Sequence, residues 1–273
     1  LGTEGGFSSL ASYNGNPVVL LTIMALITIG GLGFFVWEDI LRCGRDLRRL
    51  SLYSKMVLSF TAALILGGGL FFLLAEWDNP ATLGDMPGWK RVLNAAFQAV
   101  TLRTAGFDTI GQGNLRDSSL AMSCILMLIG GSSGSTAGGL KTVTVGVLFL
   151  TLRAGLAGRE EVTLRGRSIS HRRVMNALTL TLIVAVIFLA GSMIISLVDD
   201  VPFLSAAFES ASAMATVGVT VGITPTLSLF SHVLLICMMF LGRVGIMSFS
   251  IAFLARSKYP AKIKYPTMDI MIG

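Results

Sequence analysis

The chain has 273 residues and a mass of 29.0 kDa; 53% of its residues are hydrophobic and only 13% are charged. This composition, with a mean hydropathy of +0.77, excludes a water-soluble globular protein. On so apolar a chain, the net charge of +6 indicates cytoplasmic membrane loops, so we expect the lipid bilayer and no nucleic acid as a partner.

The N-terminal end does not look like a secretory signal. The chain starts at Leu1 with a polar stretch and has no charged n-region and no small-residue cleavage site. We therefore expect a piece of a longer protein, with N-terminal residues missing. The cysteines Cys43, Cys124 and Cys237 are far apart in the sequence and predict neither a disulfide framework nor a CxxC metal site.

The first two membrane spans flank a basic loop. Pro17 to Trp37 has the length of about 20 residues that a hydrocarbon core of ~30 Å requires, and Met56 to Ala75 forms the second span. The Lys and Arg residues between them place this loop in the cytoplasm and Leu1 outside. Over the whole chain, the segments predicted inside hold fifteen of the 21 basic residues and those outside hold four.

Two apolar segments are too short to cross the membrane. The first, Trp89 to Val100, has about a dozen residues, and the second, Pro202 to Ala213, follows two aspartates. Pro202 suits the first turn of a helix. Each segment is predicted to be a half-helix that enters the membrane and returns by a non-helical path.

The two half-helix segments carry the same pattern. One reads Ala-Ala-Phe-Gln from residue 95 and ends in Thr104-Ala105-Gly106; the other reads Ala-Ala-Phe-Glu from residue 206 and ends in Thr216-Val217-Gly218. Gly106 and Gly218 are 218 − 106 = 112 residues apart, the period of a unit of span, half-helix, loop and span. The chain therefore contains an internal repeat.

A non-helical return loop at membrane depth must line protein or water, because unpaired backbone groups are costly in lipid. The C-terminal end of each half-helix has a partial negative charge and faces the membrane centre, which favours a cation. Gly106 and Gly218 allow carbonyl groups to turn toward an axis, as ion filters require. These features predict cation pore loops; ordinary short loops between helices are the alternative.

The segment from Leu120 to Leu152, about 33 residues, is too long for one untilted crossing. Its middle, residues 130–139, holds five glycines and four hydroxyl residues, which favour an unwound loop. In transporters with discontinuous helices, such loops lie at ion sites or gates.

Two other interpretations of this loop have to be weighed. Gly134 and Gly139 have the spacing of a phosphate-binding loop, but Leu140 stands where the lysine belongs and no strand precedes the loop, so we expect no nucleotide site in this chain. The other interpretation is close packing of small residues between helices, with Lys141 reaching the cytoplasmic interface, and it stays open.

The last two spans are predicted at Val174 to Val198 and at Leu227 to Leu254, with Arg243 about midway along the second. Charged side chains at membrane depth usually face a cavity or a partner, so Arg243 is predicted either to gate a pathway or to cap loop carbonyl groups. Arg103 and Glu209 are predicted to pair behind the filter.

Four separated motifs occur in order along the chain. They are Thr101-Leu102-Arg103-Thr104-Ala105-Gly106-Phe107, residues 130–141, Ala215-Thr216-Val217-Gly218 and Gly242-Arg243-Val244-Gly245. Together they resemble the Trk/Ktr/HKT superfamily of potassium transporters. The C-terminal stretch from Tyr265 to Gly273 looks most like the Ktr-type bacterial membrane subunit, and the resemblance covers essentially the whole chain.

The resemblance implies an all-α polytopic membrane protein built from repeated units of helix, re-entrant pore helix and loop, and helix, as in a K+ channel-like transporter. The superfamily has four such repeats around one pore. Residues 1–55 would hold the last span of repeat two with its cytoplasmic loop, 56–173 repeat three with a broken second helix, and 174–273 repeat four with a short cytoplasmic tail. Without repeat one and the filter of repeat two, the chain is not expected to enclose a complete pore.

The resemblance also assigns ion-binding and gating positions. The filter positions, which would bind the transported K+, are Thr104, Ala105, Gly106, Phe107, Thr216, Val217, Gly218 and Val219. The gating positions are Gly130, Gly131, Gly134, Gly138, Gly139, Lys141 and Arg243. No catalytic residue is expected, because the sequence shows no carboxylate pair, metal-ligand cluster or nucleophile with an adjacent base.

The implied function is potassium uptake across the cell membrane through a carbonyl-lined filter that the glycine-rich loop gates. The chain would form a homodimer and bind a cytosolic nucleotide-binding regulatory ring, with the nucleotide on the ring and no cofactor in this chain. It would be a multi-pass plasma-membrane protein with Leu1 outside and Gly273 in the cytoplasm. The alternative is a non-conducting membrane scaffold whose half-helices are packing elements.

Overall fold

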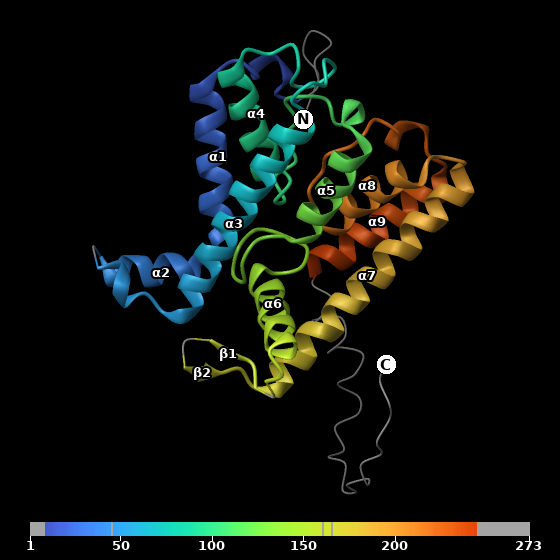
Figure 1. Cartoon of the computed structure of the whole chain (residues 1–273). Helices are drawn as coiled ribbons and strands as arrows, with labels where there is room; N and C mark the ends of the chain where they lie inside the picture. The colour runs from blue at the N-terminus through green and yellow to red at the C-terminus, as the bar shows by residue number, and fades with distance from the viewer. Residues whose placement is uncertain (1–8, 45, 160, 165, 245–273) are drawn as a thin grey trace, which may run out of the picture.

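The computed structural model describes residues 9–44, 46–159, 161–164 and 166–244, and this part of the chain is mostly helical (Figure 1). The helices are α1 (Pro17–Leu32), α2 (Phe34–Cys43), α3 (Leu52–Ala75), α4 (Gly88–Thr101), α5 (Asp117–Leu128), α6 (Thr142–Leu156), α7 (His171–Asp199), α8 (Phe203–Met214) and α9 (Leu229–Val244). An antiparallel pair, β1 (Thr163–Leu164) and β2 (Arg167–Ser168), connects α6 to α7. Short 3₁₀ turns lie at Ala11–Tyr13, Leu47–Arg49, Gln112–Asn114 and Thr224–Thr226.

Two similar units follow one another in the chain. In the first, the half-helix α4 packs against α3 and α1, and α5 and α6 are the two halves of an interrupted helix (Figure 1). In the second, the half-helix α8 packs against α7, α9 and α5. One buried apolar core contains Phe72 of α3, Met127 of α5 and Phe208 of α8, so the two units share a core.

Both predicted half-helices are present. The segment predicted from Trp89 is α4, and the segment predicted from Pro202 is α8. Pro202 precedes the first helical residue instead of lying in the first turn, because its backbone is extended with ψ 133°. Pro87 occupies the same position before α4.

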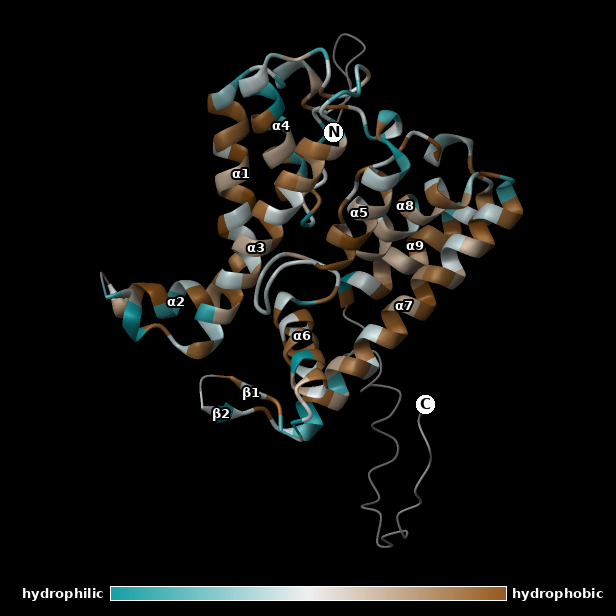
Figure 2. Cartoon of the chain, viewed as in Figure 1, coloured by the Kyte–Doolittle hydropathy of each residue, from teal (hydrophilic) through white to brown (hydrophobic). Residues whose placement is uncertain are grey.

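Two helices of the described residues, α3 and α7, are long and apolar enough to cross a membrane. A third span is counted if the bent pair α1 and α2 is taken as one, and α5, α6 and α9 are shorter apolar helices. Hydrophobic residues run along α1, α3 and α7, and polar residues gather toward the loops (Figure 2). Exposed leucines such as Leu66 and Leu182 give these helices a surface suited to lipid.

The first predicted span, Pro17 to Trp37, is not one straight helix. The helix α1 ends at Leu32, Gly33 has a φ of 81°, and α2 departs at a bend of 94°. Trp37 therefore lies in α2, beyond the bend. The last predicted span corresponds to α9, which begins at Leu229, and its residues 245–254 lie outside the described part of the chain.

The end of α3 opposite the basic loop is fixed by the buried carboxylate of Glu76. It accepts hydrogen bonds from the Asn79 side chain at 2.6 Å, the Thr82 hydroxyl at 2.8 Å and the backbone N–H of Arg116 at 3.0 Å. Burial raises the pKa of this carboxyl, but the surrounding hydrogen-bond donors outweigh burial and hold the pKa below its ordinary value.

Glu76→Gln is expected to lower the free energy of unfolding by about 1–3 kcal/mol at neutral pH, because the buried Thr82 hydroxyl and the two part-buried donors lose a charged acceptor. A lowered folded-state pKa stabilises the fold above the unfolded-state pKa, and this stabilisation disappears as the pH falls through the folded-state pKa. The difference in Tm between wild type and variant should therefore shrink between about pH 7 and about pH 3. Asp85→Asn, at an exposed position, is the control; a Tm difference that does not change with pH would contradict the assignment.

Candidate ion pathway

The segment that follows α4 forms a compact loop at the end of the half-helix. Thr104 and Gly106 both have left-handed backbone conformations, with φ of 69° and 79°. The Thr101 hydroxyl accepts a hydrogen bond from the N–H of Phe107 at 2.8 Å and donates one to the Phe107 carbonyl at 2.7 Å. The predicted filter positions 104–107 thus form one loop, the first filter loop, anchored on the last turn of α4.

The segment that follows α8 has the same construction. Thr216 and Gly218 are left-handed, with φ of 56° and 93°. The Ser212 hydroxyl accepts a hydrogen bond from the N–H of Gly218 at 3.1 Å and donates one to the Val219 carbonyl at 2.6 Å. The predicted positions 216–219 form the second filter loop.

The two threonines are held in a strained conformation. A β-branched residue with positive φ is a genuine outlier, because its side chain crowds the backbone. Among the described residues, positive φ outside glycine occurs at Ser9, Thr104, Asp200 and Thr216, and two of these are the equivalent threonines. Such strain costs about 1–3 kcal/mol per residue, persists only where the surroundings enforce it and clusters at functional sites.

The two filter loops lie against each other. A Cβ atom on Gly106 would overlap the carbonyl oxygen of Val217 in the second loop. At Gly218, no heavy atom of the described chain comes within 4 Å of the position that a Cβ would take. Glycine is therefore required at 106 by close backbone contact as well as by its φ, and at 218 by its φ alone.

A pair of glutamines braces the chain beyond the first filter loop. Gln98 of α4 and Gln112 exchange two side-chain hydrogen bonds, of 2.6 and 3.0 Å, and both residues are buried. Gln112 also donates to the Asp108 carboxylate at 2.8 Å. The half-helix thereby fixes both the start and the continuation of the loop.

The predicted pairing of Arg103 with Glu209 is wrong. Glu209 of α8 accepts hydrogen bonds from the N–H of Val221 at 3.0 Å, from the Thr224 hydroxyl at 2.9 Å and from the Thr220 hydroxyl. Arg103 donates instead to groups below the first filter loop. Because threonine and backbone donors satisfy the carboxylate, Glu209 braces the second filter loop as Gln98 braces the first.

Glu209→Ala is expected to destabilise the second filter loop, because Thr220, Val221 and Thr224 lose the charged acceptor of their hydrogen bonds, and a hydrogen bond to a charged group contributes about 1.5–3 kcal/mol. The expected results are a lower Tm and a weaker preference for Rb+ over Na+ in flux assays on reconstituted protein. Glu161→Ala, at an exposed carboxylate, is the matched control. Unchanged selectivity together with a lowered Tm would limit Glu209 to a role in stability.

The interrupted span is unwound between α5 and α6, as predicted. The N–H of Leu140 donates to the Leu128 carbonyl and the N–H of Thr142 to the Gly131 carbonyl, both at 3.0 Å. Ile129 and Leu140 also form a parallel bridge. These contacts close the ends of the glycine-rich loop, residues 130–141, so that its two limbs lie together.

The base of the glycine-rich loop lies directly against the second filter loop. A Cβ on Gly138 would overlap the Thr216 hydroxyl and would lie 2.6 Å from the Ala215 carbonyl oxygen. A Cβ on Gly130 would overlap the Gly138 carbonyl oxygen, and Gly139 has a φ of 66°. The glycines at these predicted gating positions therefore permit backbone to pack on backbone.

The first filter loop is joined to the glycine-rich loop by Arg103. Its guanidinium group donates to the Gly130 carbonyl and to the Thr142 hydroxyl, both at 3.2 Å, and the residue is only 8% exposed. The Thr142 hydroxyl donates to the same carbonyl at 3.2 Å. The glycine-rich loop is therefore attached to both filter loops.

Arg243 of α9 reaches the limb of the glycine-rich loop that leads into α6. Its guanidinium group donates to the Thr136 carbonyl. Gly242 brings α9 close to the second filter loop, because a Cβ there would overlap the Met214 carbonyl oxygen at the end of α8. The structure thus places Arg243 on a loop carbonyl, as the capping alternative required.

Lys141 contacts the same part of the loop. Its ammonium group donates to the Ala137 carbonyl at 2.7 Å. Ala137 is the neighbour of the residue that Arg243 binds, so two cationic side chains hold successive carbonyl groups below the second filter loop. Two positive charges therefore lie close together on this part of the glycine-rich loop.

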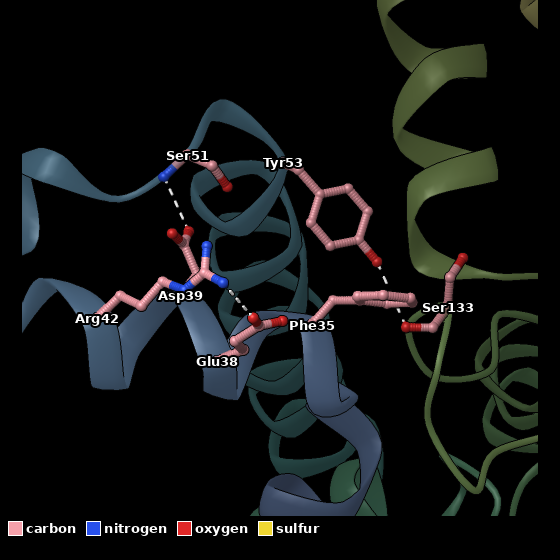
Figure 3. A pocket seen from close by; sticks show the side chains of 7 residues that line it. All are labelled: Phe35, Glu38, Asp39, Arg42, Ser51, Tyr53 and Ser133. Carbon is pink, nitrogen blue, oxygen red and sulfur yellow. Dashed lines mark hydrogen bonds and ion pairs between the residues drawn. The ribbon is translucent and has the colours of Figure 1, made fainter.

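The tip of the loop contacts the bend between α1 and α2. The N–H of Phe34 donates to the Gly134 carbonyl at 3.1 Å, and a Cβ on Gly33 would lie 2.6 Å from the Ser133 carbonyl oxygen. The Tyr53 hydroxyl donates to the same Ser133 carbonyl at 3.4 Å (Figure 3). A cavity of about 390 Å³ opens beside this contact, between α2, the start of α3 and the loop tip. Bending at Gly33 therefore makes room for the loop.

The other limb of the loop contacts α1. The N–H of Ser132 donates to the Gly31 carbonyl at 2.9 Å, and a Cβ on Gly131 would lie 2.8 Å from the same oxygen. Above this contact, a cavity of about 310 Å³ lies between α1, the first filter loop and Thr136. It lies between three predicted filter positions, Thr104, Ala105 and Phe107, and Thr136 of the glycine-rich loop.

Several residues that position the site were missed by sequence reasoning. They are Thr101 and Ser212, which close the filter loops, Gln98 and Gln112, which brace the first one, and Gly33, at which α1 bends. The repeat held a signal for two of them, because Thr101 and Ser212 are hydroxyl residues at the fourth position after the aligned Phe97 and Phe208. Gly33 offered no comparable signal within an apolar run.

Several known proteins resemble this chain in sequence or in fold. Residues 3–261 match the sequence model of the TrkH family, described as a cation transport protein. The potassium/sodium uptake protein NtpJ of Enterococcus hirae is 39% identical over 97% of this chain and 59% of its own length. The Ktr system potassium uptake protein B is 35% identical in Bacillus subtilis, over 99% of this chain and 61% of the relative. The chain thus spans about three fifths of the length of these relatives.

A solved structure, described as the potassium transporter TrkH from Vibrio parahaemolyticus, has the same fold. It superposes with a TM-score of 0.70 at 22% identity and covers 91% of this chain and 55% of that one. The all-α fold class that the resemblance implies is therefore confirmed.

Proposed function

This chain belongs to the TrkH family of cation transport proteins, and we propose on that premise that it carries potassium ions into the cell across the plasma membrane. Membership of a transporter family agrees with the prediction that the chain is not an enzyme. The names of the E. hirae and B. subtilis relatives support potassium as the ion. The observation that carries the proposal is the pair of contacting filter loops with left-handed threonine and glycine at equivalent positions.

In the proposed mechanism, K+ sheds water and enters sites formed by backbone carbonyl oxygens of residues 104–107 and 216–219. The C-terminal ends of α4 and α8 add partial negative charge beneath these sites. Thr101 and Ser212 fix the loops in advance, so little reorganisation is needed when the ion arrives. The transported ion is the cargo, and no other cofactor enters the mechanism.

The glycine-rich loop is the proposed gate. Gly138 packs on the second filter loop, and Arg103 and Arg243 bind loop carbonyl groups from outside the loop. Lys141 binds the Ala137 carbonyl within the loop. In this position the loop places two positive charges beyond the filter, which oppose the passage of a cation. Displacement of the loop would remove these charges from the path.

We further propose how the chain divides into repeats, how it is oriented and how it assembles. Residues 1–55 are taken as the end of repeat two, 56–173 as repeat three and 174–273 as repeat four, with Leu1 outside and Gly273 in the cytoplasm. The working assembly would be a homodimer with a cytosolic nucleotide-binding ring on the basic side. Charge asymmetry between the loops supports this orientation.

Ion flux separates this proposal from the alternative of a non-conducting scaffold. The full-length protein that contains this chain is reconstituted in liposomes, and Rb+ uptake is followed with and without competing K+ or Na+. The proposal predicts saturable uptake that K+ inhibits more strongly than Na+. Flux equal to that of empty liposomes would support the scaffold.

A further inference from the structure

A separate cavity lies at the end of α6, away from the ion pathway. It has a volume of about 560 Å³ and is enclosed by the last turn of α6 and the β1–β2 hairpin. The charged residues among its described lining are Arg153 and Arg159. Neither forms an ion pair with any residue that the structure describes. The described lining therefore carries two positive charges and no negative one.

The end of α6 fixes the position of the two arginines. Gly158 is left-handed with a φ of 63°, its N–H donates to the Gly155 carbonyl, and the N–H of Arg159 donates to the Ala154 carbonyl, both at 3.0 Å. This is the paired hydrogen-bond pattern of a glycine-terminated helix end. The chain turns back, so that Arg159 and Arg153 border the same cavity.

The opposite wall of the cavity is fixed as well. At the base of the β1–β2 hairpin, the N–H of Ile169 donates to the Val162 carbonyl at 2.8 Å. Both side chains pack on an apolar cluster that includes Val147 of α6 and Val174 of α7. The hairpin is thereby tied to the helices, and the cavity is a built feature of the fold.

An apolar groove continues from this cavity. A smaller cavity of about 170 Å³ shares Leu150 and Leu164 with the first and extends between α6 and α3 along Met56 and Phe60. Its lining also includes Leu52 and two polar residues, Lys55 and Ser59. The outward surface of α6 nearby is apolar, and Leu156 is 83% exposed. A charged chamber thus opens into a groove suited to a hydrocarbon chain.

We propose that the two cavities bind one anionic phospholipid, with its phosphate at Arg153 and Arg159 and an acyl chain along the groove. Guanidinium groups bind phosphate oxygens in bidentate geometry. Basic pockets between membrane helices on the cytoplasmic side recognise acidic headgroups. The phosphate could belong to a lipid headgroup or to a soluble phosphate compound. The groove favours the lipid, because a soluble compound would leave Met56, Phe60 and Leu150 uncovered.

Native mass spectrometry of the full chain in an uncharged detergent tests this site. Phosphatidylglycerol is expected to bind at least about tenfold more tightly than phosphatidylcholine, and R153Q/R159Q should weaken phosphatidylglycerol binding by about thirtyfold, the effect of two basic residues near an anionic lipid. The control, R172Q/R173Q, removes the same charge at the exposed start of α7, outside the cavity lining, and should change the affinity less than about threefold.

Three outcomes would overturn the proposal. One is a loss of affinity in R172Q/R173Q as large as that in R153Q/R159Q, which would show that the lipid is attracted only by the overall positive charge of the chain. Another is inorganic phosphate or glycerol phosphate that binds with the affinity of the lipid. The third uses the wild-type chain and does not depend on whether a variant folds: a photoactivatable phosphatidylglycerol should label residues 150–166, and labelling confined to other segments would contradict the site.

Discussion

Gly106→Ala is expected to abolish potassium transport, whereas Gly218→Ala should only reduce it. Both glycines have positive φ, which costs an alanine about 1–2 kcal/mol. At Gly106 the new Cβ would in addition overlap the Val217 carbonyl oxygen, which belongs to backbone and cannot rotate away. The first filter loop must then separate from the second, and the carbonyl groups lose their common arrangement.

The measurement is Rb+ uptake into liposomes that contain the full-length protein. For Gly218→Ala, strain of this size corresponds to a loss of up to about 30-fold in the population of the native loop, so reduced uptake and a weaker preference for K+ over Na+ are expected. Gly67→Ala is the control, because Gly67 lies in α3 and a Cβ there would meet no described atom within 4 Å. Equal effects at 106 and 218 would show that contact between the loops is unimportant.

Arg243→Ala is expected to raise potassium flux by about tenfold or more. The arginine contributes a charge-assisted hydrogen bond to the Thr136 carbonyl, and such bonds contribute about 1.5–3 kcal/mol. Its removal loosens the glycine-rich loop and takes one positive charge out of the path of the ion. Deletion of part of residues 132–136 should act in the same direction.

Two further variants separate charge from packing at this point. Arg243→Lys keeps the charge and should stay near wild-type flux if electrostatic repulsion dominates. Arg42→Ala, which removes an exposed cation that pairs with Glu38 in α2, is the control for net charge. Unchanged or lower flux in Arg243→Ala would contradict the role of the loop as a gate.

The parts of the fold that could be predicted are those that follow from local periodicity and repetition. Apolar length identified α3 and α7, and the 112-residue repeat identified α4 and α8 as equivalent half-helices. The five glycines of residues 130–139 identified the break between α5 and α6. In each case the physical cause is contained within the segment itself.

The errors have non-local causes. The bend at Gly33 exists because the tip of the glycine-rich loop, about a hundred residues later in the sequence, occupies the space beside it. The sequence predicts that Arg103 and Glu209 pair because opposite charges attract. Each instead forms hydrogen bonds with backbone and hydroxyl groups near its own filter loop. No pattern within the α1 segment, or around either charge, contains this information.

The candidate site was predictable in type but not in geometry. The Thr-x-Gly pattern at equivalent places in the repeat indicates where the filter loops lie. It does not indicate that the threonines are left-handed, or that Thr101 and Ser212 form the hydrogen bonds that close the loops. Hydroxyl residues that bond a backbone segment several positions later are common in any sequence, so they stand out only when both repeats can be compared in three dimensions.

The central claim is that the two filter loops share one cation site built from backbone carbonyl groups. The most direct measurement is the anomalous difference density of Rb+ or Tl+ in crystals of the full-length protein that contains this chain. The account predicts ion density between residues 104–107 and 216–219, which K+ displaces and Na+ does not. Loops that lie outside the bilayer region, or that show no ion density between them at saturating Rb+, would contradict it.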